Sequence, residues 1–174
     1  MKDLLHYGFI LALICAVASS LLAGVNYFAK DRIIAQAQAE ENAVLEEIFP
    51  QAANFAATKS EEEVLYYKAY DKNNKFIGVA FKASGKGYTG AIETMVGMDA
   101  AGNISEIKIL SQTETPGLGS RITKEPFTGQ FKNLNPKELE RVEAITGATI
   151  SSRAVIDSVR KKAEEIQELL KDEK

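Results

Sequence analysis

The chain has 174 residues, of which 45% are hydrophobic and 26% are charged, and its formal net charge is −3. This length suits one compact domain with an additional element and is too short for two ordinary domains. The only cysteine, Cys15, and the only histidine, His6, exclude an intrachain disulfide, a four-cysteine cluster and a histidine-based metal site or triad within the chain. We therefore expect no metal site, and without a basic run we expect no nucleic-acid partner.

The first expected element is an apolar helix over residues 8–28, a stretch that contains no charged residue. A helix of about 20 apolar residues spans a bilayer core. A cleaved signal peptide is the alternative, but its apolar region is usually only about 7–15 residues long. We therefore expect residues 1–29 to be a permanent membrane anchor in contact with lipid. The flanking charges give no clear orientation, although aromatic and basic residues suited to the membrane interface lie at both ends: Lys2, Tyr7, Tyr27, Phe28, Lys30 and Arg32.

Residues 30–50 are expected to form a simple helical stalk. They are rich in Ala, Glu and Gln, which favour helices, and Pro50 is expected to end the helix. Residues 51–174 are then expected to form the compact domain.

Four runs in the domain alternate between apolar and polar residues and are rich in β-branched or aromatic side chains. Short links rich in Asn, Asp and Gly connect them. They predict an antiparallel meander of four strands at Val64–Tyr70, Phe76–Ser84, Ala91–Met98 and Ile104–Ser111.

The pattern changes after Ser111. A Gly/Pro loop is expected at Gln112–Ser120, followed by a short helix within Ile122–Leu134 that packs Phe127 and Phe131 inward. Asn135-Pro136 predicts a turn or a helix start, and Arg141–Ile145 a further short strand. Apolar residues at helical spacing predict a final helix from about Ser152 to Asp172. Strands followed by a packed helix indicate an α+β domain.

One motif, Thr146-Gly147-Ala148-Thr149-Ile150-Ser151-Ser152, lies between the expected short strand and the final helix. Gly147 and Ala148 leave space beside the Thr149 hydroxyl, and Ser151 or Ser152 is a suitable N-cap. The free N–H groups and positive dipole end of a helix start favour a phosphate. An ordinary helix cap is the alternative, and the residues alone favour it.

A second motif is Glu114-Thr115-Pro116-Gly117-Leu118-Gly119. Pro116 fixes one backbone dihedral, and Gly117 and Gly119 permit unusual ones. Such a loop can bring backbone N–H groups and the Leu118 side chain against a flat ring. Taken alone, this motif and Gly87-Tyr88-Thr89-Gly90 are both weak signals.

Together and in this order, GYTGAI, VGMDAAGNI, ETPGLG and TGATISSRAV resemble the FMN-binding domain family. The similarity is to the subunit designated G in the Rnf electron transport complexes, whose sister is the subunit designated C in the sodium-pumping NADH:quinone oxidoreductases. The resemblance extends to the anchor and the final helix. It implies a membrane-anchored flavoprotein that relays electrons within an ion-translocating ferredoxin:NAD oxidoreductase and does not turn over a substrate alone.

The resemblance also implies that FMN is bound covalently, by a phosphoester to Thr149, and that a separate FMN transferase makes this bond. It places the chain in the cytoplasmic membrane of a prokaryote, as a single-pass protein with its domain on the extracytoplasmic side and the other membrane and soluble subunits of the complex as partners. We expect the phosphate to contact Gly147, Ala148 and Ser151, and the ring to lie against Thr115, Gly117 and Leu118, with Tyr88 as a further neighbour.

Two residues depart from the family pattern. Glu143 stands where an aspartate is usual, six residues before the acceptor threonine, and Gln112 stands where a histidine is common. Three other readings remain open: a non-redox membrane-anchored binding module, a stand-alone flavin reductase, and the quinone-reducing sister complex. The chain lacks the G-x-G-x-x-G fingerprint that a reductase with its own NAD(P)H site would be expected to show.

Overall fold

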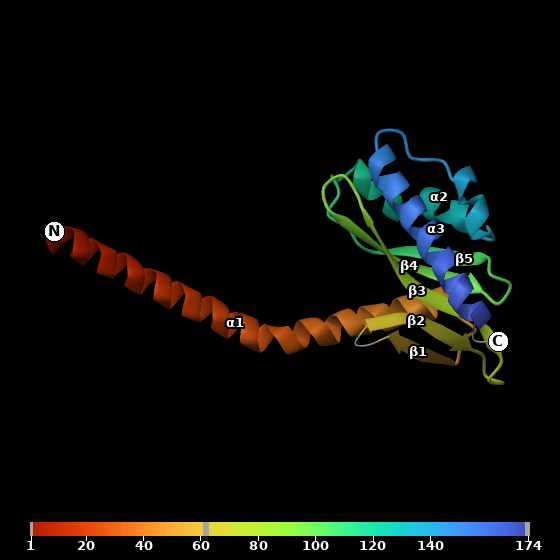
Figure 1. The fold of residues 1–174 in the computed structure, drawn as a ribbon, viewed down its shortest axis with the longest axis horizontal. Coiled ribbons are helices and arrows are strands. Elements are labelled where there is room, and N and C mark those ends of the chain that lie inside the picture. Colours follow the sequence, from red (N-terminus) through yellow and green to blue (C-terminus); the bar gives the residue numbers. More distant parts are fainter. Residues whose placement is uncertain (1, 61–62, 173–174) are drawn as a thin grey trace. The chain divides into compact units, whose positions relative to one another are not determined.

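The computed structural model describes residues 2–60 and 63–172 (Figure 1). Met1 of the expected anchor and residues 61–62 and 173–174 of the expected domain lie outside the described residues, as does the side chain of Lys2. The chain divides into two compact units, Met1–Asn42 and Ala43–Lys174, and each is described by itself.

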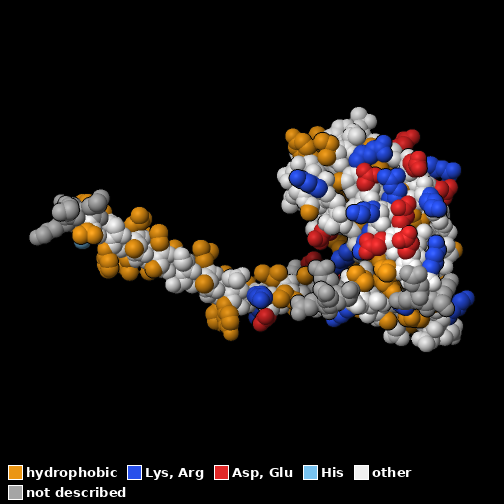
Figure 2. Space-filling view, viewed as in Figure 1, with side chains coloured by type: hydrophobic (Ala, Val, Ile, Leu, Met, Phe, Trp, Pro, Cys, Tyr) orange, Lys and Arg blue, Asp and Glu red, His pale blue; other side chains and the backbone are white. Residues whose placement is uncertain are grey.

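Helix α1, Lys2–Ile48, is continuous, which confirms the expected apolar helix and its continuation as far as Ile48. Its most apolar window has a mean hydropathy of 2.4 and no buried residue, and by length and composition the helix can cross a membrane. Figure 2 shows apolar side chains along its N-terminal part. The helix ends two residues before Pro50, because a proline disfavours the helical conformation in the residue that precedes it.

The second unit contains one antiparallel sheet with the strand order β1-β2-β3-β4-β5 (Figure 1). The expected meander of four strands is confirmed, and β1 is an additional strand that the sequence analysis missed. Strand β1 pairs along β2 at the edge of the sheet and is mostly exposed, so it shows no apolar alternation. The strands are β1, Asn54–Ser60; β2, Glu63–Tyr70; β3, Phe76–Lys86; β4, Ala91–Asp99; and β5, Ile104–Ser111.

Helix α3, Thr149–Asp172, covers one face of this sheet and buries Val155, Val159 and Ile166 against it. Four short helical segments lie between β5 and α3. The expected inward packing of Phe127 and Phe131 is confirmed, and their rings meet edge to face at 5.4 Å. The short segments are η1, Gly119–Thr123; α2, Glu125–Thr128; η2, Gly129–Phe131; and η3, Pro136–Arg141.

The end of α1 covers the opposite face, where Leu45, Ile48 and Phe49 are buried. A Cβ on Gly97 of β4 would lie 2.2 Å from Ile48 Cγ2, so only glycine allows this approach. The centre of β4 is therefore buried on both faces. The compact unit begins within the segment that we expected to be a stalk.

Three expectations about the region before α3 have different outcomes. The helix start at Asn135-Pro136 is confirmed, because Asn135 caps η3 with a capping box. The strand expected at Arg141–Ile145 is wrong: η3 continues to Arg141, and the backbone N–H and carbonyl of Glu143 bond to the Gln130 side chain in place of a neighbouring strand. The final helix begins at Thr149, three residues before the expected start.

Candidate functional site

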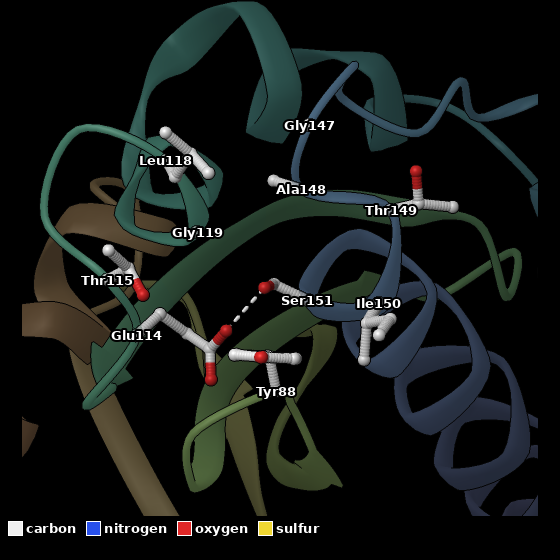
Figure 3. A pocket seen from close by; sticks show the side chains of 10 residues that line it. All are labelled: Tyr88, Glu114, Thr115, Leu118, Gly119, Gly147, Ala148, Thr149, Ile150 and Ser151. Carbon is white, nitrogen blue, oxygen red and sulfur yellow. Dashed lines mark hydrogen bonds between the residues drawn. The ribbon is translucent and has the colours of Figure 1, made fainter.

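A cleft of about 420 Å³ opens where three segments of the second unit meet. Its size lies within the range of small-molecule sites, roughly 300–1,000 Å³. The segments are the β3–β4 hairpin, the loop after β5 and the start of α3. Figure 3 shows one side chain from each of them, Tyr88, Glu114 and Ser151, close together, with Thr149 to one side. The lining residues are Tyr88, Glu114, Thr115, Leu118, Gly119, Gly147, Ala148, Thr149, Ile150 and Ser151.

The first wall is the start of α3. A turn joins it to the preceding loop: the N–H of Ala148 donates to the carbonyl of Ile145 at 2.9 Å, and Gly147, third in the turn, has φ +83°. Thr149 is the first helical residue, and its side chain is exposed. Within the described residues, the N–H groups of residues 149–151 donate to no protein acceptor, as the first turn of a helix leaves them. This wall therefore offers an accessible hydroxyl beside free donors.

The expected N-cap role of Ser151 or Ser152 is wrong, because both residues lie inside the first turn of α3. The Ser152 hydroxyl accepts from the N–H of Ile145 at 3.1 Å and donates to the carbonyl of Ala148 at 2.9 Å. The Ser151 hydroxyl donates to the Glu114 carboxylate, as Figure 3 shows. Ser152 thus closes the turn before the helix, and Ser151 joins the helix to the loop after β5.

The second wall is the loop after β5. The N–H of Leu118 donates to the carbonyl of Thr115 at 3.1 Å, with Pro116 second and Gly117 third in the turn. Gly117 has φ +77°, as the third residue of a type II turn requires. Gly117 does not itself line the cleft; its backbone conformation places Leu118, whose side chain is 53% exposed.

The third wall is the hairpin loop Gly87–Gly90, where the N–H of Gly87 donates to the carbonyl of Gly90 at 2.8 Å. Tyr88 at its tip is 73% exposed and lines the cleft. In the described part of the second unit, the large exposed apolar side chains are Tyr88, Leu118 and Ile150, and all three lie at this cleft. The cleft thus has an apolar rim on all three walls.

Glu114 lies where the walls converge, and its side chain is only 4% exposed. One carboxylate oxygen accepts from the N–H of Thr89 at 2.9 Å and more weakly from that of Gly90 at 3.4 Å, while the other accepts from Ser151. Burial by itself raises the pKa of Glu114. The bonds from Ser151 and from the hairpin N–H groups outweigh burial and hold the pKa below its ordinary value, so the carboxylate is ionised at neutral pH.

The structure brings seven of the eight predicted site residues to the cleft, and Gly117 supports it from the turn. Three further residues line the cleft: Glu114, which was not predicted, and Gly119 and Ile150, which lie inside the two predicted segments but were not named singly. Glu114 and Gly119 lie at the two ends of the ETPGLG motif, which was the available signal. Within the described residues there is no cluster of three His, Cys, Asp or Glu side chains that could hold a metal ion.

The two departures from the family pattern have defined places. The Gln112 side-chain oxygen accepts from the N–H of Glu114 at 2.6 Å, a role that a neutral histidine nitrogen can also fill. The Glu143 side chain is exposed on the loop before α3. Neither residue lines the cleft.

Comparison with known families places this cleft in a defined class. Residues 87–164 match the model of the FMN-binding domain, a span that runs from the hairpin loop into α3 and includes all three walls. Residues 1–48 match the model of the RnfG N-terminal region, which ends where α1 ends. Fold and site thus define an FMN-binding domain that follows a long apolar helix.

Individual relatives identify the family. The subunit designated G in the proton-translocating ferredoxin:NAD(+) oxidoreductase complex of Clostridium ljungdahlii is 31% identical, over 90% of this chain and 88% of that protein. The subunit with the same designation in an ion-translocating oxidoreductase complex of Methanosarcina acetivorans is 35% identical, over 86% and 87%. The chain belongs to the RnfG family of Rnf complex subunits.

Among solved structures, NqrC of Shewanella oneidensis shares 18% identity with a TM-score of 0.47, covering 69% of this chain and 73% of that one. At this level the likeness carries no functional conclusion.

Proposed function

We propose that this chain is the membrane-anchored, flavin-carrying subunit of an ion-translocating ferredoxin:NAD oxidoreductase complex, with FMN bound covalently to Thr149. The observation that carries the proposal is the exposed Thr149 hydroxyl at a helix start, beside free N–H groups and at the edge of an apolar-rimmed cleft. The relatives from Clostridium ljungdahlii and Methanosarcina acetivorans carry names of this kind of complex.

The residues of the first wall fit the phosphate end of FMN. The free N–H groups and the positive end of the 24-residue helix α3 favour a phosphate. A Cβ on Gly147 would meet nothing within 4 Å, so there is open space beside the acceptor hydroxyl. The Ser151 hydroxyl already donates to Glu114, which leaves the backbone N–H groups as the donors for the phosphate.

The rim of the cleft fits the flavin ring. Tyr88, Leu118 and Ile150 expose apolar surface around a space of suitable volume, although apolar side chains of this size are usually buried. Bound FMN supplies electron transfer, while the chain supplies attachment, orientation and a wall that keeps the ring beside the protein. A covalent link retains the cofactor on a site that is open to solvent.

We expect attachment to need a second protein, because the described residues that line the cleft include no histidine, and the oxygens of the one carboxylate among them, Glu114, already accept from Ser151 and Thr89. The only histidine is His6, and it lies in the other unit. A threonine hydroxyl needs an adjacent base or a metal to become a nucleophile. We therefore propose that a separate FMN transferase acts on Thr149, which the exposed position of its side chain permits.

The assignment of segments completes the proposal. Residues 1–29 form the single membrane anchor in contact with lipid, residues 30–50 connect it to the domain, and residues 51–174 bind FMN. The domain lies on the extracytoplasmic side of the cytoplasmic membrane, among the other membrane and soluble subunits. The length and composition of α1 support the anchor. A Lys161→Cys variant tests the orientation, because an impermeant thiol reagent added to intact cells should label it.

Covalent attachment is tested by producing the full chain with an FMN transferase, denaturing it, and measuring in-gel flavin fluorescence and intact mass. Thr149→Ala should abolish both signals, and Thr149→Ser, which keeps a hydroxyl, should retain them at a lower level. Thr146→Ala is the matched control, because Thr146 is an exposed threonine of the same motif. Fluorescence retained in Thr149→Ala would refute Thr149 as the acceptor.

The role in the complex is tested in membranes of a host whose own RnfG protein has been deleted. The wild-type chain should restore electron transfer from reduced ferredoxin to NAD⁺, and Thr149→Ala should not. Restoration by Thr149→Ala would contradict the relay, and reduction of a quinone instead of NAD⁺ would favour the sister complex.

A further inference from the structure

The buried carboxylate of Glu114 contacts segments that are distant in the sequence. Thr89 lies 25 residues before it and Ser151 lies 37 residues after it, and both donate hydrogen bonds to it. Glu114 itself lies in the loop after β5, and its backbone N–H donates to the side-chain oxygen of Gln112. One side chain therefore joins all three walls of the cleft, and Figure 3 shows its carboxylate directed toward the Ser151 hydroxyl.

The bonds to this carboxylate all come from uncharged groups. In the described part of the chain, no Lys, Arg or His forms an ion pair with Glu114. Its partners are a hydroxyl at the positive end of α3 and the N–H groups of the hairpin loop. A buried anion without a counter-ion is stable only while such donors keep their positions. The buried charge thus restricts the positions of the three walls more closely than an apolar side chain would, because its donors must stay in place.

Two glycines make room for the carboxylate. A Cβ on Gly87 would lie 2.6 Å from Glu114 Oε1, and a Cβ on Gly119 would lie 2.8 Å from Oε2 and 2.9 Å from the Ser151 hydroxyl oxygen. Side chains at either position would displace the carboxylate or its donor. The space that holds the Glu114 carboxylate is therefore formed by the hairpin and the loop together.

We propose that Glu114 is a positioning residue of the FMN site, whose carboxylate holds the hairpin, the loop and the start of α3 in one arrangement. It acts through Ser151 and the hairpin backbone, and it presents the Thr149 hydroxyl and the apolar rim to the cofactor at the same time. The role of Glu114 in FMN binding rests on the proposed function. The arrangement of the walls does not, because it can be measured on the chain without FMN.

Two substitutions of similar size separate hydrogen bonding from packing. Glu114→Gln keeps an oxygen for the hairpin N–H groups and an amide N–H for the Ser151 oxygen, whereas Glu114→Met fills the space without an acceptor. Ile166→Ala is the control for lost stability, because it opens a cavity in α3 about four turns away from Ser151.

The first measurement is hydrogen exchange on the cofactor-free full chain in detergent. We expect Glu114→Met to raise exchange in residues 87–90, 115–119 and 149–152 together, and Glu114→Gln to restore protection in all three. Ile166→Ala should not raise exchange in these three segments relative to the rest of the domain. Wild-type protection in both the Met and the Gln variant would overturn the proposal, because it would mean that packing alone holds the walls. Equally raised exchange in both variants would support it and would mean that the charge of Glu114 is needed as well as its hydrogen bonds.

The second measurement is the rate of FMN attachment by the transferase. A lost hydrogen bond to a charged group corresponds to about a tenfold change, so Glu114→Met should attach FMN at least about tenfold more slowly than wild type. Ser151→Ala removes one of the contacts and should slow attachment less. The double variant should be no slower than Glu114→Met, because the contact is already lost. Additive effects would overturn the contact as the cause.

The two proposals fail in different ways. If Thr149→Ala keeps its flavin, the acceptor assignment fails while the exchange pattern still tests Glu114. If wild type is flavinylated at Thr149 and Glu114→Met behaves like wild type in exchange and attachment rate, the positioning role fails while the proposed function stands.

Discussion

The two turns on opposite sides of the cleft have the same construction and different surroundings. In residues 115–118 and in residues 145–148, the fourth N–H donates to the first carbonyl, and the third residue is a glycine with φ +77° or +83°. The second turn leads directly into the 24-residue helix α3, whereas the first leads into a short 3-10 turn. The first wall, which carries Thr149, is therefore held by the packing of a long helix as well as by the contact of Ser151 with Glu114. The second wall has no long helix behind it and depends more on Glu114 for its position.

The largest effect on stability is expected where the second wall, the loop after β5, contacts Glu114. A Cβ on Gly119 would lie 2.7 Å from Glu114 Cβ, which cannot move without the loop. Gly119→Ala should therefore lower the free energy of unfolding by about 2–3 kcal/mol, as overpacking does. Urea unfolding of the full chain in detergent measures this.

Gly129→Ala is the matched control for Gly119→Ala. Gly129 has helical dihedrals, and its Cβ would meet only the end of the flexible Glu125 side chain at 3.1 Å. The control should be neutral or stabilising by about 0.4–1 kcal/mol. An equal loss of unfolding free energy in both variants would show that the space around the Glu114 side chain is not tightly packed.

Substituting Gly117 and Gly147, the glycines with positive φ in the two turns, tests whether the two turns matter equally. Neither Cβ would meet an atom within 4 Å, so Gly117→Ala and Gly147→Ala should each cost about 1–2 kcal/mol from backbone strain alone. Flavin attachment should fall more in Gly147→Ala, because that turn leads directly to Thr149.

Gly147→Asn should recover part of the attachment, since asparagine tolerates positive φ better than alanine does. In-gel fluorescence after a fixed time with the transferase measures all three variants. Equal attachment in the two alanine variants would mean that the turn at residues 115–118 matters as much for FMN attachment as the turn at residues 145–148.

The sequence predicted those parts of the fold that rest on local patterns. Strands β2 to β5 alternate clearly, and the glycines of both turns could be recognised from their motifs. Strand β1 could not be predicted, because its pairing with Glu63–Tyr70 leaves most of its side chains exposed. The false strand at Arg141–Ile145 has strand-like residues, but a side-chain amide takes the place of its partner.

The site was predicted as two separate motifs, and the residue that joins them was not. The contacts of Glu114 with Thr89 and Ser151 depend on three segments that only the folded sheet brings together. Ser151 and Ser152 read as helix caps because small polar residues favour that position. Their hydroxyls have other partners because the helix begins earlier, at Thr149.

A smaller effect is expected for the charge of Glu114, and its sign follows from the pKa. The pKa of Glu114 in the folded chain lies below its ordinary value of 4.5, so ionisation contributes stability above that value, and the contribution is lost as the pH falls through the folded pKa. Wild type should therefore lose stability relative to Glu114→Gln when the pH falls from about 5 to below 4.5. Parallel pH profiles of the unfolding midpoint would contradict an ionised carboxylate in the folded state.

The smallest effect concerns the loop that leads to the acceptor turn. Gln130 accepts from the N–H of Glu143 at 2.8 Å, and its amide group donates to the carbonyls of Pro126 at 3.2 Å and Glu143 at 3.4 Å. Gln130→Ala should cost about 1 kcal/mol and slow FMN attachment by at most roughly fivefold. Gln130→Glu keeps the acceptor for the Glu143 N–H and loses the donor, so its attachment rate should lie between wild type and Gln130→Ala. If the alanine variant attaches FMN at the wild-type rate, the loop before α3 has no part in presenting the Thr149 hydroxyl.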